Sequence, residues 1–336
     1  MVSPVRPMPR PAPGSHTPID LSGRYVRMVT EETMSTVLQS LSTELAAAVE
    51  SAGRAIVAIH ARRRIPASGV HWRPGVIVAT HHTIHRDEAI TVTLPDGTTR
   101  PATLAGRDAS TDLAVLRLAD PGLPTASPRP DAPKAGELVI ALGRPGPSLT
   151  ASWGVVSRVA GPWRTWHGAE IDTLLRLDLA IYDGFSGGPL IDSGARVLGI
   201  NTSALARGAP VTIPVATVER VVTELLERGT IRRAYLGIGT QAVRVPQSLA
   251  HTLDLTSDVA LLIVSVEPGG PADRDGVLLG DVLLELDGAA VRDPVDVLAQ
   301  LGGDRVGRLI AARVIRGGQV KTLQLSPGER PKPQAA

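Results

Sequence analysis

The chain has 336 residues, with 35 basic and 33 acidic side chains and a formal net charge of +2. This balance gives no basic excess that would indicate nucleic acid as the main partner. The absence of cysteine excludes disulfides, thiol catalysis and cysteine-ligated metal sites. Aromatic residues make up only 2% of the chain, so we expect aliphatic cores, and the length predicts about two domains.

Residues 1–35 are rich in proline and predict a flexible arm. The arm lacks the apolar core of a secretory signal, and no apolar stretch is long enough to span a membrane. We therefore expect a cytoplasmic protein without a membrane span. Apolar residues then recur at helical spacing, which predicts a helix over 36–50 that Gly53 ends.

From residue 55 to about residue 213 the chain consists of short β-type runs separated by glycine, proline and aspartate. Regular short strands with turn signals are typical of all-β barrels or sandwiches. The length of this region exceeds one small barrel and favours two. Examples of these runs are AIVAI, GVIVA, AITVTL, LAVLRL, ELVIALG, WGVVSRV, LLRLDLAI and RVLGIN.

An amphipathic helix is predicted over 217–228, with Gly229 as its stop. A second, smaller α/β unit follows, with a buried strand over 261–266 and a helix capped by Asp293 with Pro294 at its first position. The predicted domains are therefore the arm over 1–35, a domain over 36–229, a domain over 234–328 and a tail over 329–336.

The most informative motif is Gly-Phe-Ser-Gly-Gly-Pro-Leu over 184–190. A serine hydroxyl becomes a useful nucleophile when a base takes its proton and backbone N–H groups solvate the developing oxyanion. Glycines beside Ser186 permit a tight turn that points the N–H groups of Gly184 and Ser186 into one hole. The simpler interpretation is a glycine-rich turn, in a chain that contains 34 glycines.

Partners for Ser186 lie upstream. His82 follows a β-type run, and Asp112 stands before another, 30 residues later. The order His, Asp, Ser is that of chymotrypsin-type enzymes, in which histidine is the base and aspartate orients it. Separately, His82 can be a surface histidine and Asp112 a turn cap, a role that we assign to Asp108. The run His-His-Thr-Ile-His over 81–85 also permits a zinc site, although no carboxylate motif accompanies it.

Together these motifs resemble those of HtrA/Deg-type serine proteases, over roughly residues 36–328. The resemblance implies a mainly β fold, with a trypsin-like double β-barrel followed by a small α/β PDZ domain. It also implies a His82, Asp112, Ser186 triad, an oxyanion hole from the backbone of Gly184, Phe185 and Ser186, and no metal or cofactor. The motifs that carry it are HHTI, TDLAVL, LDLAIYDGFSGGPL, VLGINT, VTIPVATVERVV and YLGIG.

The chain departs from the family pattern near the triad. Phe185 stands where the family has asparagine, and Tyr182 and Asp183 replace asparagine and proline. The register favours His82 as the base, but the adjacent His81 remains an alternative.

The resemblance also locates the specificity pocket. In trypsin-like folds the residue six before the nucleophile lies at the pocket base, and here it is Ala180. With Val211 and Thr212 as an apolar lining, this predicts cleavage after small or medium aliphatic residues, because a pocket without a carboxylate leaves a basic side chain unpaired.

For the PDZ domain the resemblance implies capture of peptide C-termini by a loop and strand that include Tyr235, Leu236, Gly237 and Ile238, with Leu298 on the facing helix. Peptide binding there either recruits unfolded proteins or shifts the protease into an active arrangement. A homotrimer is implied as well, although Tyr25 is the only aromatic residue near the N-terminus.

We therefore predict a serine endopeptidase that hydrolyses unfolded or damaged proteins through an acyl-enzyme. The alternative is a protease-like PDZ adaptor or chaperone, whose triad is misassembled by the changes around His82 and Phe185.

Overall fold

The computed structural model describes residues 31–63, 65–119, 122–206 and 211–329, with side chains from residue 36 on. The predicted arm up to residue 30, including Tyr25, and the predicted tail from residue 330 lie outside this range. The chain divides into two compact units, residues 1–46 and 47–336.

Helix α1 (Glu31–Gly53) begins earlier than the predicted residue 36. Within this part of the helix, Val37 and Leu38 are 60% and 62% exposed. Closer to the end of the helix, Ala48 is buried.

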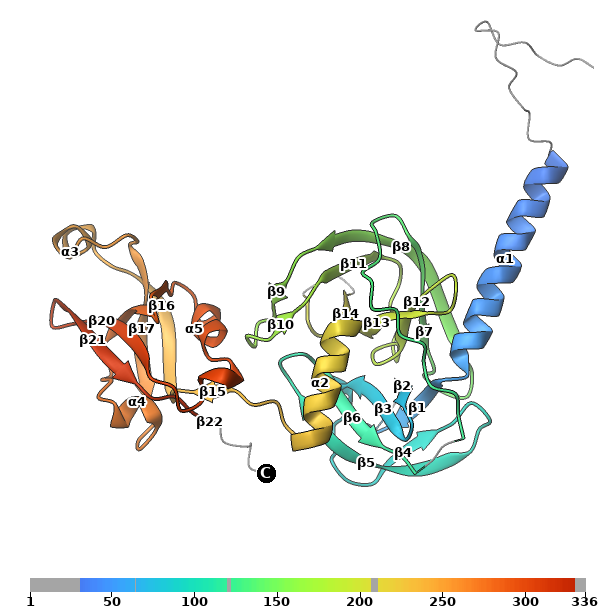
Figure 1. Cartoon of the computed structure of the whole chain (residues 1–336), viewed down its shortest axis with the longest axis horizontal. Helices are drawn as coiled ribbons and strands as arrows, with labels where there is room; N and C mark the ends of the chain where they lie inside the picture. Colours follow the sequence, from blue (N-terminus) through green and yellow to red (C-terminus); the bar gives the residue numbers. More distant parts are fainter. Residues whose placement is uncertain (1–30, 64, 120–121, 207–210, 330–336) are drawn as a thin grey trace, which may run out of the picture. The chain divides into compact units, whose positions relative to one another are not determined.

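Two closed six-stranded barrels follow in the chain, and the β-runs named above supply eight of their twelve strands (Figure 1). The first contains β1 (Ile56–His60), β2 (Ala67–Arg73), β3 (Val76–Thr80), β4 (Ile90–Thr93), β5 (Thr99–Asp108) and β6 (Leu113–Arg117), in the order β1-β2-β3-β6-β5-β4. The second contains β7 (Leu138–Gly143), β8 (Thr150–Ala160), β11 (Leu174–Asp178), β12 (Pro189–Asp192), β13 (Val197–Thr202) and β14 (Val211–Pro214), in the order β11-β14-β13-β12-β7-β8.

The barrel interiors are mostly aliphatic, as the composition predicts. In the first barrel, valine, isoleucine, leucine and alanine make up the buried cluster. In the second, Phe185 is added to such residues and is fully buried. A two-stranded hairpin, β9 (Trp163–Arg164) and β10 (Glu170–Ile171), lies between β8 and β11 in the sequence.

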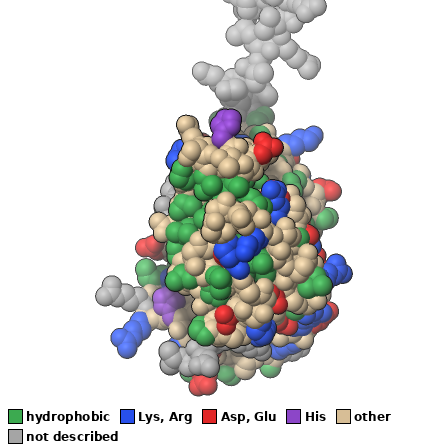
Figure 2. Space-filling view, turned by 90° about the vertical axis from the view of Figure 1, so that its left-hand side faces the viewer, with side chains coloured by type: hydrophobic (Ala, Val, Ile, Leu, Met, Phe, Trp, Pro, Cys, Tyr) green, Lys and Arg blue, Asp and Glu red, His purple; other side chains and the backbone are tan. Residues whose placement is uncertain are grey.

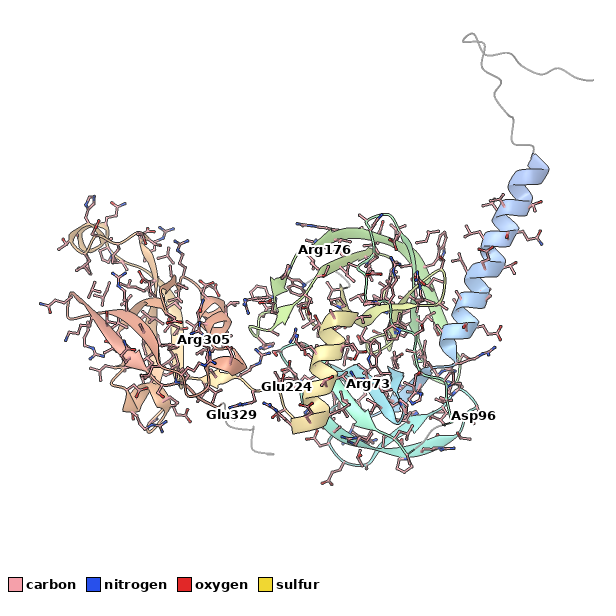
Figure 3. All side chains as sticks on the ribbon, viewed as in Figure 1. Arg73, Asp96, Arg176, Glu224, Arg305 and Glu329 are labelled. Atoms are coloured by element: carbon pink, nitrogen blue, oxygen red, sulfur yellow. The ribbon has the colours of Figure 1, made fainter. Side chains whose placement is uncertain are left out.

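Helix α2 (Val215–Arg228) confirms the predicted amphipathic helix, and Gly229 ends it at a φ of +74°. Its buried face contains Val218, Val221, Val222 and Leu225. On another face, Glu219 accepts a hydrogen bond of 2.8 Å from the indole N–H of Trp72 and pairs with Arg73, both in β2 of the first barrel. Arg73 is labelled in Figure 3.

The C-terminal part consists of β15 (Ala234–Tyr235), β16 (Ile238–Arg244), α3 (Gln247–Thr252), β17 (Val259–Val266), α4 (Pro271–Arg274), β18 (Val282–Leu286), β19 (Ala289–Ala290), α5 (Pro294–Gln300), β20 (Ile310–Arg316), β21 (Gln319–Leu325) and β22 (Gly328–Glu329). Its main sheet has the order β16-β17-β18-β20-β21. Strand β16 is thus an edge strand.

The predicted cap of α5 is present. Asp293 accepts from the Val295 N–H at 2.8 Å, and Asp296 accepts from the Asp293 N–H at 3.0 Å, which completes a capping box. Across the described residues, no helix is long and apolar enough to cross a membrane. Figure 2 shows hydrophobic side chains scattered among basic and acidic ones on the face that it presents.

Candidate active site

His82 and Asp112 are brought together by the pairing of β3 with β6. Thr80, the last residue of β3, pairs with Leu113, the first residue of β6, and His82 follows in a short 3-10 turn over 81–83. The Nδ1 of His82 lies 2.8 Å from Oδ2 of Asp112, and the His82 backbone N–H donates to Oδ1 at 2.9 Å. Because a carboxylate only accepts, Nδ1 carries the proton and Nε2 is left with a free lone pair.

The carboxylate of Asp112 is almost completely buried and fully hydrogen-bonded. Its side chain is 3% exposed, and Thr202 in β13 donates its hydroxyl to Oδ2 at 2.5 Å. Asp112 adopts a left-handed φ of +57°, a conformation that aspartate tolerates better than most residues. Its backbone carbonyl accepts from the His81 N–H at 3.0 Å. The pair is therefore held in one orientation from both barrels.

His81 faces a different environment from His82. Its Nδ1 is buried and finds no hydrogen-bond partner among the described residues. Burial, together with the charge of Arg107, lowers the pKa of His81 below its usual 6.5. Of the two candidate bases, only His82 is paired through its ring with Asp112.

The loop before Asp112 is shaped by Asp108. The Asp108 carboxylate accepts hydrogen bonds from the backbone N–H groups and the hydroxyls of Ser110 and Thr111, at 2.6 to 3.2 Å. Asp108 is therefore the turn cap of this loop, as its position indicates.

Ser186 lies in the loop between β11 and β12. Its hydroxyl is 3.2 Å from the hydroxyl of Ser203, and the hydrogen bonds found between described residues do not include one to His82. Ser186, Ser203 and His82 nevertheless line one cleft of about 420 Å³. Ser186 and His82 thus face a shared space, and catalytic hydrogen bonds are often long before substrate binds.

The turn around Ser186 leaves two backbone donors free. Gly184 and Gly187 have left-handed φ values of +86° and +89°, which glycine adopts without strain. Within the described part of the chain, the N–H groups of Gly184 and Ser186 donate no hydrogen bond. The N–H of Phe185 instead donates to the carbonyl of Tyr182 at 3.0 Å.

Of the three residues predicted for the oxyanion hole, Phe185 therefore offers no donor. Its side chain is fully buried, with its ring edge-on to Tyr182 at a centroid distance of 5.4 Å. Phe185 anchors the loop, while Gly184 and Ser186 are the groups that can solvate an oxyanion.

The predicted specificity residues do not line this cleft. Ala180 is exposed, Val211 is buried within β14, and the Thr212 hydroxyl donates to Oδ1 of Asn201 at 2.9 Å. Strand β11 ends at Asp178, so the following residues leave the barrel before they reach the cleft. Its other walls are formed by Arg62, Arg63, Ile65, His85, Ile181, Tyr182, Asp183 and Gly184.

The C-terminal part places Tyr235, Leu236, Gly237, Ile238 and Leu298 around one groove. Gly237 has a φ of +75°, and its carbonyl accepts from the Glu267 N–H at 2.8 Å. Among the described residues, the N–H groups of Leu236 and Gly237 donate to no acceptor. A loop with free N–H groups beside an edge strand can hold a terminal carboxylate and pair with an extended peptide.

Known protein families match both the double barrel and the C-terminal part of the chain. A trypsin-like peptidase domain model matches residues 67–200, and a PDZ domain model matches residues 234–326. A "probable periplasmic serine endoprotease DegP-like" protein of Rhizobium meliloti is 32% identical over 265 residues, which cover 76% of this chain and 52% of the relative. The "putative serine protease HhoB" of Synechocystis is 30% identical, over 77% of this chain and 65% of the relative.

Two solved structures have the same fold. An "HtrA-type protease AlgW with tripeptide" has a TM-score of 0.65 at 30% identity, covering 86% of this chain and 98% of the other. A "serine endoprotease from Yersinia pestis" has a TM-score of 0.67 at 28% identity, covering 85% and 98%. The chain spans about half the length of the DegP-like relatives.

These relatives correct the expected location. Proteins from Rhizobium meliloti, Brucella suis and Halomonas elongata that match this chain are named periplasmic, so the expectation of a cytoplasmic protein is wrong. With a double barrel, a PDZ domain and these matches, the chain belongs to the HtrA/Deg-type family of trypsin-like serine proteases.

Proposed function

We propose that this chain is a serine endopeptidase of the extracytoplasmic space that cleaves unfolded or damaged proteins through an acyl-enzyme. The observation that carries the proposal is the His82–Asp112 pair of 2.8 Å, which borders the same cleft as Ser186. A paired imidazole with a free Nε2 beside a serine hydroxyl is the arrangement that acyl transfer requires.

The reaction follows from these positions. Ser186 Oγ attacks the peptide carbonyl carbon, and Nε2 of His82 takes the hydroxyl proton. The buried Asp112 carboxylate stabilises the resulting imidazolium, and the N–H groups of Gly184 and Ser186 bind the oxyanion. His82 then protonates the leaving amine. Water then attacks the acyl carbon as it gives a proton to the same nitrogen, and His82 returns that proton to Ser186 Oγ as the acid product leaves.

In this proposal the protease domain covers residues 36–229 and the PDZ domain covers residues 234–328. The groove beside β16 binds the C-terminus of a peptide: the free N–H groups of Leu236 and Gly237 donate to the terminal carboxylate, and Leu298 contacts an apolar side chain. Bound peptides recruit substrate or activate the protease domain.

A homotrimer belongs to the proposal on the family resemblance alone, since Tyr25 lies outside the described residues. Light scattering on the purified protein tests this state. It is expected to give three times the mass of the 35.1-kDa chain, and a mass of one chain would contradict it.

Turnover of an unfolded protein by the purified chain and by its Ser186→Ala variant tests the activity. We expect fragments from the first and none from the second. The alternative of an inactive PDZ adaptor is favoured by one observation, the contact of Ser186 with Ser203 in place of His82. Binding of unfolded protein without cleavage, also after addition of an apolar C-terminal peptide, would establish that alternative.

A further inference from the structure

A buried serine of the first barrel holds the loop that carries the nucleophile in the second. Ser68, in β2, is fully buried. Its hydroxyl donates to the carbonyl of Gly184 at 2.6 Å and accepts from the backbone N–H of Arg144 at 2.7 Å. Both groups that it joins are backbone groups of the second barrel's loops.

The backbone of Ser68 makes two further contacts with the same loop. Its N–H donates to the carbonyl of Ser186 at 3.3 Å. Its carbonyl lies so close to Gly187 that a Cβ added there would be 2.1 Å from the oxygen. One residue of β2 therefore fixes Gly184, Ser186 and Gly187 from one side.

The donor to the Ser68 hydroxyl is itself held firmly. The Arg144 side chain is buried, and its guanidinium donates to the carbonyls of Ile56 at 2.8 Å, Pro147 at 2.9 Å and Gly53 at 3.2 Å. Because three hydrogen bonds fix the Arg144 side chain, the Arg144 backbone N–H gives the Ser68 hydroxyl a fixed orientation toward Gly184.

We infer that Ser68 is a positioning residue for the oxyanion hole, an inference that rests on the proposed function. The peptide between Gly184 and Phe185 is held at both polar ends, its carbonyl by Ser68 and its N–H by Tyr182. Gly184 has no side chain to restrain it. Without the hydroxyl, the buried carbonyl turns to find another donor, and the Gly184 N–H turns away from the cleft.

The variant Ser68→Ala tests this role. Loss of one oxyanion donor costs about 100- to 1000-fold in kcat, and because Ser68 acts through Gly184, we expect a fall in kcat of about 10- to 100-fold. KM and the pH profile stay unchanged, because the His82–Asp112 pair is not touched. The rate of labelling of Ser186 by a phosphonate falls in parallel with kcat.

A matched control separates positioning from stability. Thr217 in α2 is equally buried, and its hydroxyl accepts from the Asp172 N–H at 3.1 Å and donates to the Asp172 carboxylate. Thr217→Ala loses a bridging hydroxyl as well, and we expect a lower unfolding midpoint with kcat within about twofold of wild type. Equal losses of kcat in both variants would overturn the inference.

Ser68→Cys provides a second variant of similar volume with a weaker donor, and its kcat is expected between those of wild type and Ser68→Ala. Wild-type turnover tests the proposed function, whereas the ratio of variant to wild type tests this inference. If the wild type has no turnover, crystals of the variants still decide: a Gly184 carbonyl turned away from its wild-type direction supports the inference, and an unchanged one refutes it.

Discussion

Replacement of Phe185 by alanine tests how the nucleophile loop is anchored. Phe185 is the largest fully buried side chain of the described structure, and it packs in the second barrel with residues such as Leu177 and Leu190. A buried aromatic side chain removes about 150–250 Å² from water, which corresponds to about 4–6 kcal/mol as an upper limit. Measured Phe→Ala changes in cores cost about 3–5 kcal/mol, and we expect Phe185→Ala to lie in that range.

Phe185→Asn restores the residue type of the family pattern, but we expect this variant to be no more stable than Phe185→Ala. The amide would lie in the apolar cluster around Phe185, where an unpaired polar group costs about 1–3 kcal/mol. We expect a loss of stability at least as large as that of Phe185→Ala, unless the loop turns the amide outward.

The assay uses the position of the tryptophans. All four tryptophans of the chain lie between residues 72 and 166, so urea unfolding followed by tryptophan fluorescence reports the protease domain alone. With a slope of about 2 kcal/mol per molar, the expected loss moves the midpoint by about 1.5–2.5 M. Leu286→Ala, at a fully buried PDZ position, is the control and leaves this midpoint unchanged. A shift below about 0.5 M for Phe185→Ala would refute the anchoring role.

Three further predictions follow from single contacts. Asp112→Asn removes the acceptor for the His82 Nδ1–H and is expected to lower kcat about 10⁴-fold, measured on a peptide substrate; a loss below tenfold would contradict it. Burial opposes ionisation of Asp281, but hydrogen bonds from Arg316 and the Leu278 N–H outweigh it and hold its pKa below the usual 3.8. The contribution of Asp281 to PDZ stability is therefore present above pH 4 and lost as the pH falls through the lowered pKa. Hydrogen exchange in β20 should show this loss. In Arg316→Gln, the exchange rates should depend less on pH. Gly237→Ala places a Cβ 3.1 Å from the Glu267 carboxylate at a φ of +75°. Fluorescence anisotropy of a labelled C-terminal peptide should show binding at least about tenfold weaker than to the wild type. An unchanged Kd would contradict the loop as the carboxylate site.

Local patterns were enough to predict the main elements of the fold. Each of the eight named β-runs overlaps a strand of one of the two barrels, because short apolar runs bounded by glycine, proline or aspartate specify strands locally. The capping residues of α5 were also visible in the sequence, since Asp293, Pro294 and Asp296 act within one turn. The helix start at Glu31 was missed because the prediction followed the apolar stripe, which begins at Val37, whereas residues 31–36 are polar apart from Met34.

The contacts between barrels could not be predicted in this way. Ser68, Arg144 and Thr202 reach the site only because strands distant in sequence come together on barrel closure. Thr202 was present in the VLGINT motif, yet nothing local assigns its hydroxyl to Asp112. Likewise, the local sequence does not place Ala180 in space, because counting back from Ser186 does not show where the chain leaves β11.

Labelling by a fluorophosphonate, with the modified peptide identified by mass spectrometry, tests the central claim most directly. The account predicts one label per chain, on Ser186, at a rate that falls steeply in His82→Ala and in Asp112→Asn. A label on Ser203, or folded protein that is not labelled at all, would contradict a His82–Asp112–Ser186 catalytic site.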